Sequence, residues 1–219
     1  MPILNMVYWA TWSWPTPEIW ATNLVGYRPL QSDANDHKAD VWASWTTYDW
    51  TWSWTATYGA VSWRTWASFS NNSYIDTGVS IWNRPLSYAL SLLKTDNWAY
   101  WRTAFWQDKN SNPNYWILGQ ETNMYVHWWD STDSTIVSNY STNTRYNIVV
   151  TTDGSWTIKY YLNWTLMGTK SWGQDVTWHN WCIAKWIGNY CNWAYMSHCA
   201  IWDKELDASE ISAFNTYIS

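Results

Sequence analysis

Glycine, glutamate, cysteine and basic charge are all scarce in this sequence. The 219 residues include eight glycines, well under the usual share of about 7%. The 12 lysines and arginines are scattered and the formal net charge is -5, so no basic stripe is available to bind nucleic acid. No apolar run approaches the length that spans a membrane. The first residues lack a basic segment followed by an apolar core, so we expect no signal peptide and a soluble protein.

Cysteine is rare and unevenly placed. The three cysteines are Cys182, Cys191 and Cys199. An odd count without an early partner is not typical of a disulfide framework, and the spacing does not match a zinc site. Two interpretations stay open: small buried strand residues, or one disulfide and a free thiol.

Tryptophan, in contrast, is far more frequent than in ordinary proteins, with 26 residues. Many stand where turns are expected, such as every second residue of the polar run 49–54 and the pair Asn163–Trp164 between two strand-like segments. A two-residue hairpin loop favours Asn-Gly, because both residues need a positive φ. Trp carries a Cβ and is strained there.

Two interpretations of this excess compete. The indoles could form platforms that stack on sugar rings. Alternatively, many Trp letters could stand for glycine, as happens when UGA codons that mean glycine are translated as Trp. Some Trp must still be genuine, and Trp202, between Ile201 and Asp203, is a good candidate. An intact mass distinguishes the two interpretations.

Short strand-like segments recur along the chain, separated by polar turns. Residues 41–54 and the first 22 residues, which contain Pro2, Pro15 and Pro17, are expected to be irregular. Near the end, Asp207 and Glu210 are spaced as a capping box, which predicts one short C-terminal helix. Many short strands predict an all-β antiparallel sandwich. The expected strands are residues 24–30, 56–61, 67–69, 73–79, 88–93, 101–106, 115–118, 123–129, 146–151, 157–162, 182–187 and 195–202.

Four stretches give this pattern a more specific resemblance. Residues 200–211 run from a strand that ends in an aromatic, through a polar turn, to a helix start, and residues 146–163 form hairpins that end in a Tyr-x-Asn turn. With residues 24–36 and 67–78, they resemble the laminin-G-like, concanavalin A-like jelly-roll domains. The resemblance covers residues 23–219 and implies a two-sheet jelly roll preceded by an arm, residues 1–22. The chain also resembles proteins of phages and uncultivated bacteria.

Catalysis is not expected, although glycoside hydrolases share this fold. Retaining hydrolysis needs two carboxyl groups a few ångströms apart. The four glutamates are Glu18, Glu121, Glu205 and Glu210. Glu18 falls in the arm, Glu205 and Glu210 belong to the closing turn and helix, and Glu121 stands alone. The four histidines lack the context of a catalytic serine.

Two candidate binding sites remain. In the opening loop, Asp33, Asn35 and Asp36 supply oxygen ligands suited to calcium, the ion common in the resembled family, although a solvated turn explains them as well. The acid that relatives often add early on the last strand is missing. Tyr125, His127 and Trp129 alternate and so share one face of a strand. They suit a sugar-stacking site, unless that face packs in the core.

These observations lead to three hypotheses for function. The first is a non-enzymatic virion or surface module, of phage decoration or fibre type, that binds glycans or assembles with neighbouring subunits, with homo-oligomerisation left open. The second is a secreted, extracellular lectin-like domain of a bacterial surface. The third is a glycoside hydrolase of the same fold, which the glutamate pattern disfavours.

Overall fold

The computed structural model describes a chain of short strands and one C-terminal helix. Among the residues that the structure describes, no helix is long and apolar enough to cross a membrane. The described residues are 23–28, 51–53, 56–61, 64–69, 74–80, 85–94, 102–107, 115–120, 123–128, 134–137, 141–154, 157–171, 180–183 and 195–218.

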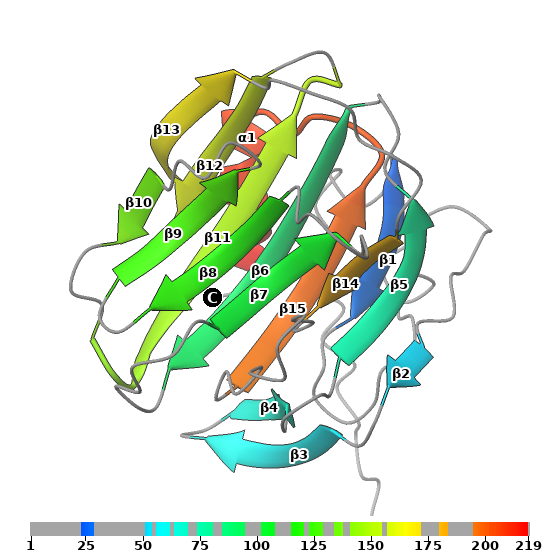
Figure 1. The fold of residues 1–219 in the computed structure, drawn as a ribbon, viewed down its shortest axis with the longest axis vertical. Helices are drawn as coiled ribbons and strands as arrows, with labels where there is room; N and C mark the ends of the chain where they lie inside the picture. The colour runs from blue at the N-terminus through cyan, green and yellow to red at the C-terminus, as the bar shows by residue number, and fades with distance from the viewer. Residues whose placement is uncertain are drawn as a thin grey trace, which may run out of the picture.

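Two antiparallel sheets lie one in front of the other (Figure 1). The eight-stranded back sheet has the order β13-β12-β11-β6-β15-β4-β3, with β1 also paired to β15. The seven-stranded front sheet has the order β10-β9-β8-β7-β14-β5-β2. The back strands are β1 (Leu24–Arg28), β3 (Ala56–Val61), β4 (Arg64–Phe69), β6 (Leu86–Lys94), β11 (Thr144–Thr152), β12 (Thr157–Leu162), β13 (Thr165–Ser171) and β15 (Tyr195–Trp202). The front strands are β2 (Thr51–Ser53), β5 (Tyr74–Ser80), β7 (Arg102–Gln107), β8 (Tyr115–Gln120), β9 (Asn123–Trp128), β10 (Ser134–Val137) and β14 (Asn180–Ile183).

Alternation along the strands separates an inner from an outer face in each sheet. In β6, Tyr88, Leu90 and Leu92 are buried on one face, while Ala89 belongs to a cluster on the other. Burial raises the pKa of the Tyr88 phenol far above its ordinary value. In the front sheet, Met124 is fully buried, so its face of β9 is the inner one. On that face, one row of residues in register is apolar in five strands: Val126, Ile117, Phe105, Ile183 and Ile75.

Helix α1 (Ala208–Ile218) lies behind the back sheet (Figure 1). It buries Ile211, Phe214 and Ile218 against a row in register on the outer face of that sheet. The small side chains of Ala200 and Ala89 in this row leave room for the larger groups of the helix. The row is Ala200, Ala89, Val149 and Tyr161.

Both ends of α1 are held by specific hydrogen bonds. The Asp207 carboxylate accepts from the amide of Glu210 at 2.9 Å, and the amide of Asp207 donates to the Glu210 carboxylate at 3.0 Å. The expected capping box is therefore formed. At the other end, the Arg145 guanidinium donates to the carbonyl of Ile218, to Asn147 Oδ1 at 3.0 Å and to Ser91 Oγ at 3.1 Å.

Several sequence expectations need correction. Residues 41–54 were expected to be loop, but β2 lies within them and pairs with β5. It is a three-residue strand at the edge of the sheet, too short for a pattern along the sequence to predict. Strand β10 (Ser134–Val137) was likewise not foreseen. The strand expected at residues 182–187 begins two residues earlier, and its described part is Asn180–Ile183; residues 184–187 lie outside the described residues.

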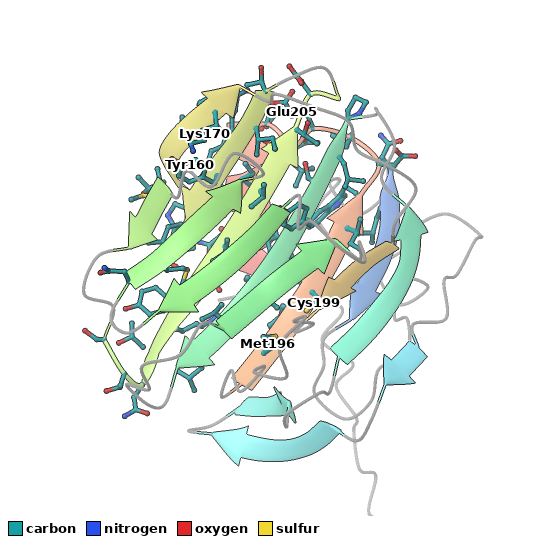
Figure 2. The ribbon with its side chains drawn as sticks, viewed as in Figure 1. Tyr160, Lys170, Met196, Cys199 and Glu205 are labelled. Carbon is teal, nitrogen blue, oxygen red and sulfur yellow. The ribbon has the colours of Figure 1, made fainter. Side chains whose placement is uncertain are left out.

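Strand β15 follows its expected bounds and carries Cys199. Cys199 is fully buried, in agreement with a small strand residue. It follows His198, which is 8% exposed and has a φ of 54°, at a register shift between Ser197 and Ala200. A register shift of this kind is typical of a β-bulge. Figure 2 shows Met196 and Cys199 on this strand.

Candidate functional site

Strand β9 places two of the three candidate sugar-binding residues on one face. Tyr125 and His127 occupy alternate positions of β9, and Met124 between Asn123 and Tyr125 is fully buried on the other face. Alternation therefore places positions 125 and 127 on the face of β9 opposite Met124, and the sugar-binding role of Tyr125 and His127 stays a prediction. Trp129 lies outside the described residues.

Strand register extends this outer face beyond β9. Trp116 of β8 is opposite His127, and Leu118 is opposite Tyr125. Trp106 of β7 is in turn opposite Trp116. Neighbouring strands are about 4.8 Å apart, so positions 127, 116 and 106 form a continuous row across three strands. The row combines an imidazole position with two positions written as Trp.

The same row continues into the other half of the front sheet. Cys182 of β14 is in register with Trp106, and Asp76 of β5 is in register with Cys182. Sequence reasoning missed these positions, because the strands that carry them are far apart along the chain. Alternation within β9 gave the signal for Tyr125 and His127, but no local pattern predicts which strand lies beside which.

The two outer faces of the sandwich differ in what covers them. On the back sheet, α1 packs over Ala89, Val149, Tyr161 and Trp202. On the front sheet, none of the helices or strands that the structure describes lies over the row of Tyr125 and His127 (Figure 1).

The carboxylates of the closing turn have structural roles. Glu205 accepts a hydrogen bond from Lys159 Nζ at 2.7 Å, and this bond raises the pKa of Lys159. Glu210 pairs with Lys204 and closes the capping box. Hydrogen bonds from the Ser209 hydroxyl and the Glu210 amide lower the pKa of Asp207. Figure 2 shows Glu205 near the top of the view.

No metal centre is formed by the residues that the structure describes, since they contain no group of three or more His, Cys, Asp and Glu side chains able to share an ion. The candidate calcium ligands Asp33, Asn35 and Asp36 lie outside those residues, as do Glu18 and Glu121. The calcium prediction therefore stays a prediction.

Comparisons with known proteins bear on the fold. No protein-family model matches the chain, and no curated protein sequence matches it. Among solved structures, domain 4 of AbnA, an extracellular GH43 arabinanase of Geobacillus stearothermophilus solved with arabinotriose, is similar. Its TM-score is 0.68 at 15% identity, over 89% of this chain and 99% of that domain.

Two botulinum neurotoxin structures are also similar. The receptor-binding domain of the C/D mosaic serotype has a TM-score of 0.67 at 12% identity, over 89% of this chain and 51% of that chain. The serotype D ligand-binding domain, solved with N-acetylneuraminic acid, has a TM-score of 0.65 at 11% identity, with the same coverages. This chain thus spans about half the length of these toxin domains.

Identities this low show the fold alone. The protein is a two-sheet antiparallel jelly-roll sandwich with a short C-terminal helix, as the sequence predicted.

Proposed function

We propose that this domain is a non-enzymatic glycan-binding module whose ligand lies on the outer face of the front sheet. The observation that carries the proposal is the placement of Tyr125 and His127 on that face of β9, while α1 covers the outer face of the back sheet. A tyrosine ring offers an apolar face with a hydroxyl at its edge, and imidazole adds a second hydrogen-bonding group. Together these groups suit a sugar ring, which has an apolar side and a hydroxyl rim.

Carbohydrate is also the ligand class of two structural neighbours. One was solved with arabinotriose and one with N-acetylneuraminic acid. Neither sugar transfers to this chain at 11–15% identity. The neighbours support the ligand class, while the alternation of Tyr125 and His127 along β9 supports the proposed location.

The non-enzymatic part of the proposal rests on the carboxylates. Hydrolysis of a glycosidic bond requires an acid and a second carboxylate free to act on it. Glu205 is paired with Lys159, and Glu210 is paired with Lys204 and caps α1. A release of reducing sugar from polysaccharides by the purified protein would contradict this part.

We further propose that the domain works on a virion or cell surface, as a decoration or fibre-type module of a phage, with residues 1–22 as an arm that docks to a neighbouring subunit. The alternative is a secreted lectin-like domain of a bacterial surface. Immunogold labelling of phage particles and host cells separates them, because only the first predicts label on purified virions.

A glycan array followed by calorimetry tests the binding proposal. The Tyr125→Ala and His127→Ala variants are expected to weaken binding of any array hit by about tenfold or more each, the loss typical of a central contact residue. Thr169→Ala on the exposed edge strand β13 serves as the control and keeps full affinity. Unchanged affinity in both β9 variants, with unchanged melting, would place the site elsewhere. No hit on a broad array would remove the lectin function and leave assembly.

Calcium is proposed for the opening loop on the oxygen ligands Asp33, Asn35 and Asp36 alone. A bound ion stabilises the folded state by mass action. The melting temperature is therefore expected to rise with calcium and fall with chelator, and an unmoved value would favour a solvated turn.

We also propose that the producing organism reads UGA as glycine, so that many Trp letters stand for glycine. The low glycine count and the Trp letters in turn-like runs support it. The composition of the proposed binding face depends on this recoding, because positions 106 and 116 beside His127 would carry either indole side chains or glycine.

A further inference from the structure

The hairpin between β12 and β13 has a turn of two residues with left-handed backbone. Asn163 has a φ of 44° and Trp164 a φ of 59°, and β12 ends at Leu162 while β13 begins at Thr165. Two central residues with positive φ define a type I′ turn, the connection whose twist matches that of the strands. Asn followed by Gly is the preferred pair for this turn.

The surrounding structure holds the turn in this geometry independently of the Trp side chain. The amide of Asn163 donates to the Asn147 carbonyl at 2.7 Å, and Asn163 Oδ1 accepts from the amide of Asn147 at 2.9 Å. The side chain of Asn147 in turn donates to Asn215 Oδ1 of α1 at 3.1 Å. Asn tolerates the left-handed region through such local bonds. Trp164 has no comparable reason to occupy it.

The indole at position 164 gains little in return for its backbone strain. Trp164 is 43% exposed. Trp202 is the opposite case: it is fully buried and meets the Phe214 ring edge to face, with centroids 5.2 Å apart. A glycine at position 202 would leave a large void in the core. Position 164 therefore favours glycine and position 202 favours tryptophan, although the sequence has Trp at both.

We infer that residue 164 of the natively made protein is glycine and residue 202 is tryptophan. The inference concerns the chain itself and does not depend on whether the domain binds glycans. It makes the recoding proposal specific to single residues, because it predicts a UGA codon at position 164 and a UGG codon at position 202. The hairpin then has the preferred Asn-Gly turn, and the core keeps its largest buried side chain.

The backbone-strain argument is tested by the stability of variants of a protein produced with Trp at position 164. Trp164→Gly is expected to lower the unfolding equilibrium constant about five- to thirty-fold, by removing a left-handed residue that carries a Cβ. Trp164→Ala is the matched control: it also removes the indole but keeps the Cβ, so it is expected to recover much less. Equal gains for both variants would show that indole exposure, and not backbone strain, is responsible, and would overturn the inference from the turn.

The reverse outcome is expected at position 202. Trp202→Gly is expected to raise the unfolding equilibrium constant by several orders of magnitude or to prevent folding. In the second case, Trp202→Phe still gives a measurable loss. A Trp202→Gly variant as stable as the parent would overturn the assignment at 202.

Peptide mass spectrometry of protein purified from its native producer tests the identity of residues 164 and 202 directly. Trypsin cleaves after Lys159 and Lys170, and the peptide 160–170 contains Trp164 as its single Trp letter. The mass of this peptide is expected to be that of glycine at 164. The peptide that contains position 202 is expected to keep tryptophan there. Tryptophan at position 164 in natively made protein would refute the inference, whatever the glycan array shows.

Discussion

Trp202, the last residue of β15, meets Phe214 of α1 edge to face, with ring centroids 5.2 Å apart and ring planes at 85°. Both residues are buried, and together they join the last strand to the helix. Ser87 holds the turn between β15 and α1. Its hydroxyl donates to the Lys204 carbonyl at 2.8 Å and accepts from the Leu206 amide at 2.9 Å.

This contact predicts that α1 is part of the cooperative fold. Phe214→Ala is expected to lower the free energy of unfolding by about 3–5 kcal/mol, the cost of truncating a buried aromatic. Ser212→Ala, at an exposed position of the same helix, is the control and is expected to change stability by less than about 0.5 kcal/mol. Urea denaturation followed by circular dichroism measures both. A small loss for Phe214→Ala would mean that α1 unfolds independently of the sheets.

The helix cap gives a prediction about pH. Asp207→Ala is expected to cost about 1 kcal/mol, the usual value of an N-cap. Hydrogen bonds from the Ser209 hydroxyl and the Glu210 amide lower the pKa of Asp207 in the folded state. The stability they contribute is therefore complete above the unfolded pKa of an aspartate and is lost as the pH falls through the lowered folded value.

Asp207→Asn separates the cap from the titration. Asparagine caps a helix about as well as aspartate but does not titrate, so this variant is expected to lose less stability than the parent between neutral and acid pH. Melting temperatures of the parent and the variant across that range measure the difference. Parallel curves would show that Asp207 contributes nothing to acid sensitivity.

The sequence predicted this fold well where local pattern and structure agree. Strands β3, β12 and β15 have the expected bounds, and the cap of α1 forms as the Asp207 and Glu210 spacing indicates. The Asn163–Trp164 pair adopts the positive φ angles that a two-residue hairpin requires. Each of these features is encoded within a few consecutive residues.

The features that the sequence did not predict depend on pairing between strands that are far apart along the chain. Strand β2 has three residues, Thr51, Trp52 and Ser53, and is recognised by its pairing with β5. The row from His127 to Asp76 crosses five strands whose order is set by the closing of the two sheets. Alternation within β9 could therefore place Tyr125 and His127 on one face, but not the residues beside them.

A buried hydroxyl on β11 predicts a stabilising substitution. Thr151 is fully buried, and no group among the described residues hydrogen-bonds to its Oγ1. An unsatisfied buried polar atom costs about 1–3 kcal/mol. Thr151→Val replaces the hydroxyl by a methyl group of similar shape and is expected to raise the free energy of unfolding by about 1 kcal/mol.

The matched control for this substitution is Thr169→Val. Thr169 lies in the same row across β12 and is exposed, so its hydroxyl can be solvated and the change is expected to be close to zero. Chemical denaturation of both variants measures the contrast. A destabilised Thr151→Val would indicate that water satisfies the hydroxyl inside the fold.

Gly168 and Tyr160 predict a steric coupling at the edge of the back sheet, where Figure 2 shows Tyr160 beside β13. The two residues are paired in register, and a Cβ built on Gly168 would lie 2.0 Å from Tyr160 Oη and 2.4 Å from its ring. Tyr160 is buried at 6% exposure, so its ring has little room to move. Gly168→Ala is therefore expected to cost about 1–3 kcal/mol, the range for overpacking.

Removing the ring is expected to remove this cost. In a double-mutant cycle with Tyr160→Val, the Gly168→Ala substitution is expected to become nearly neutral, because the added methyl group then occupies the space that the tyrosine ring leaves. The cycle is measured by urea denaturation of the parent, both single variants and the double variant. Additive losses would mean that the cost at position 168 arises from the backbone, and that Tyr160 is not what requires glycine there.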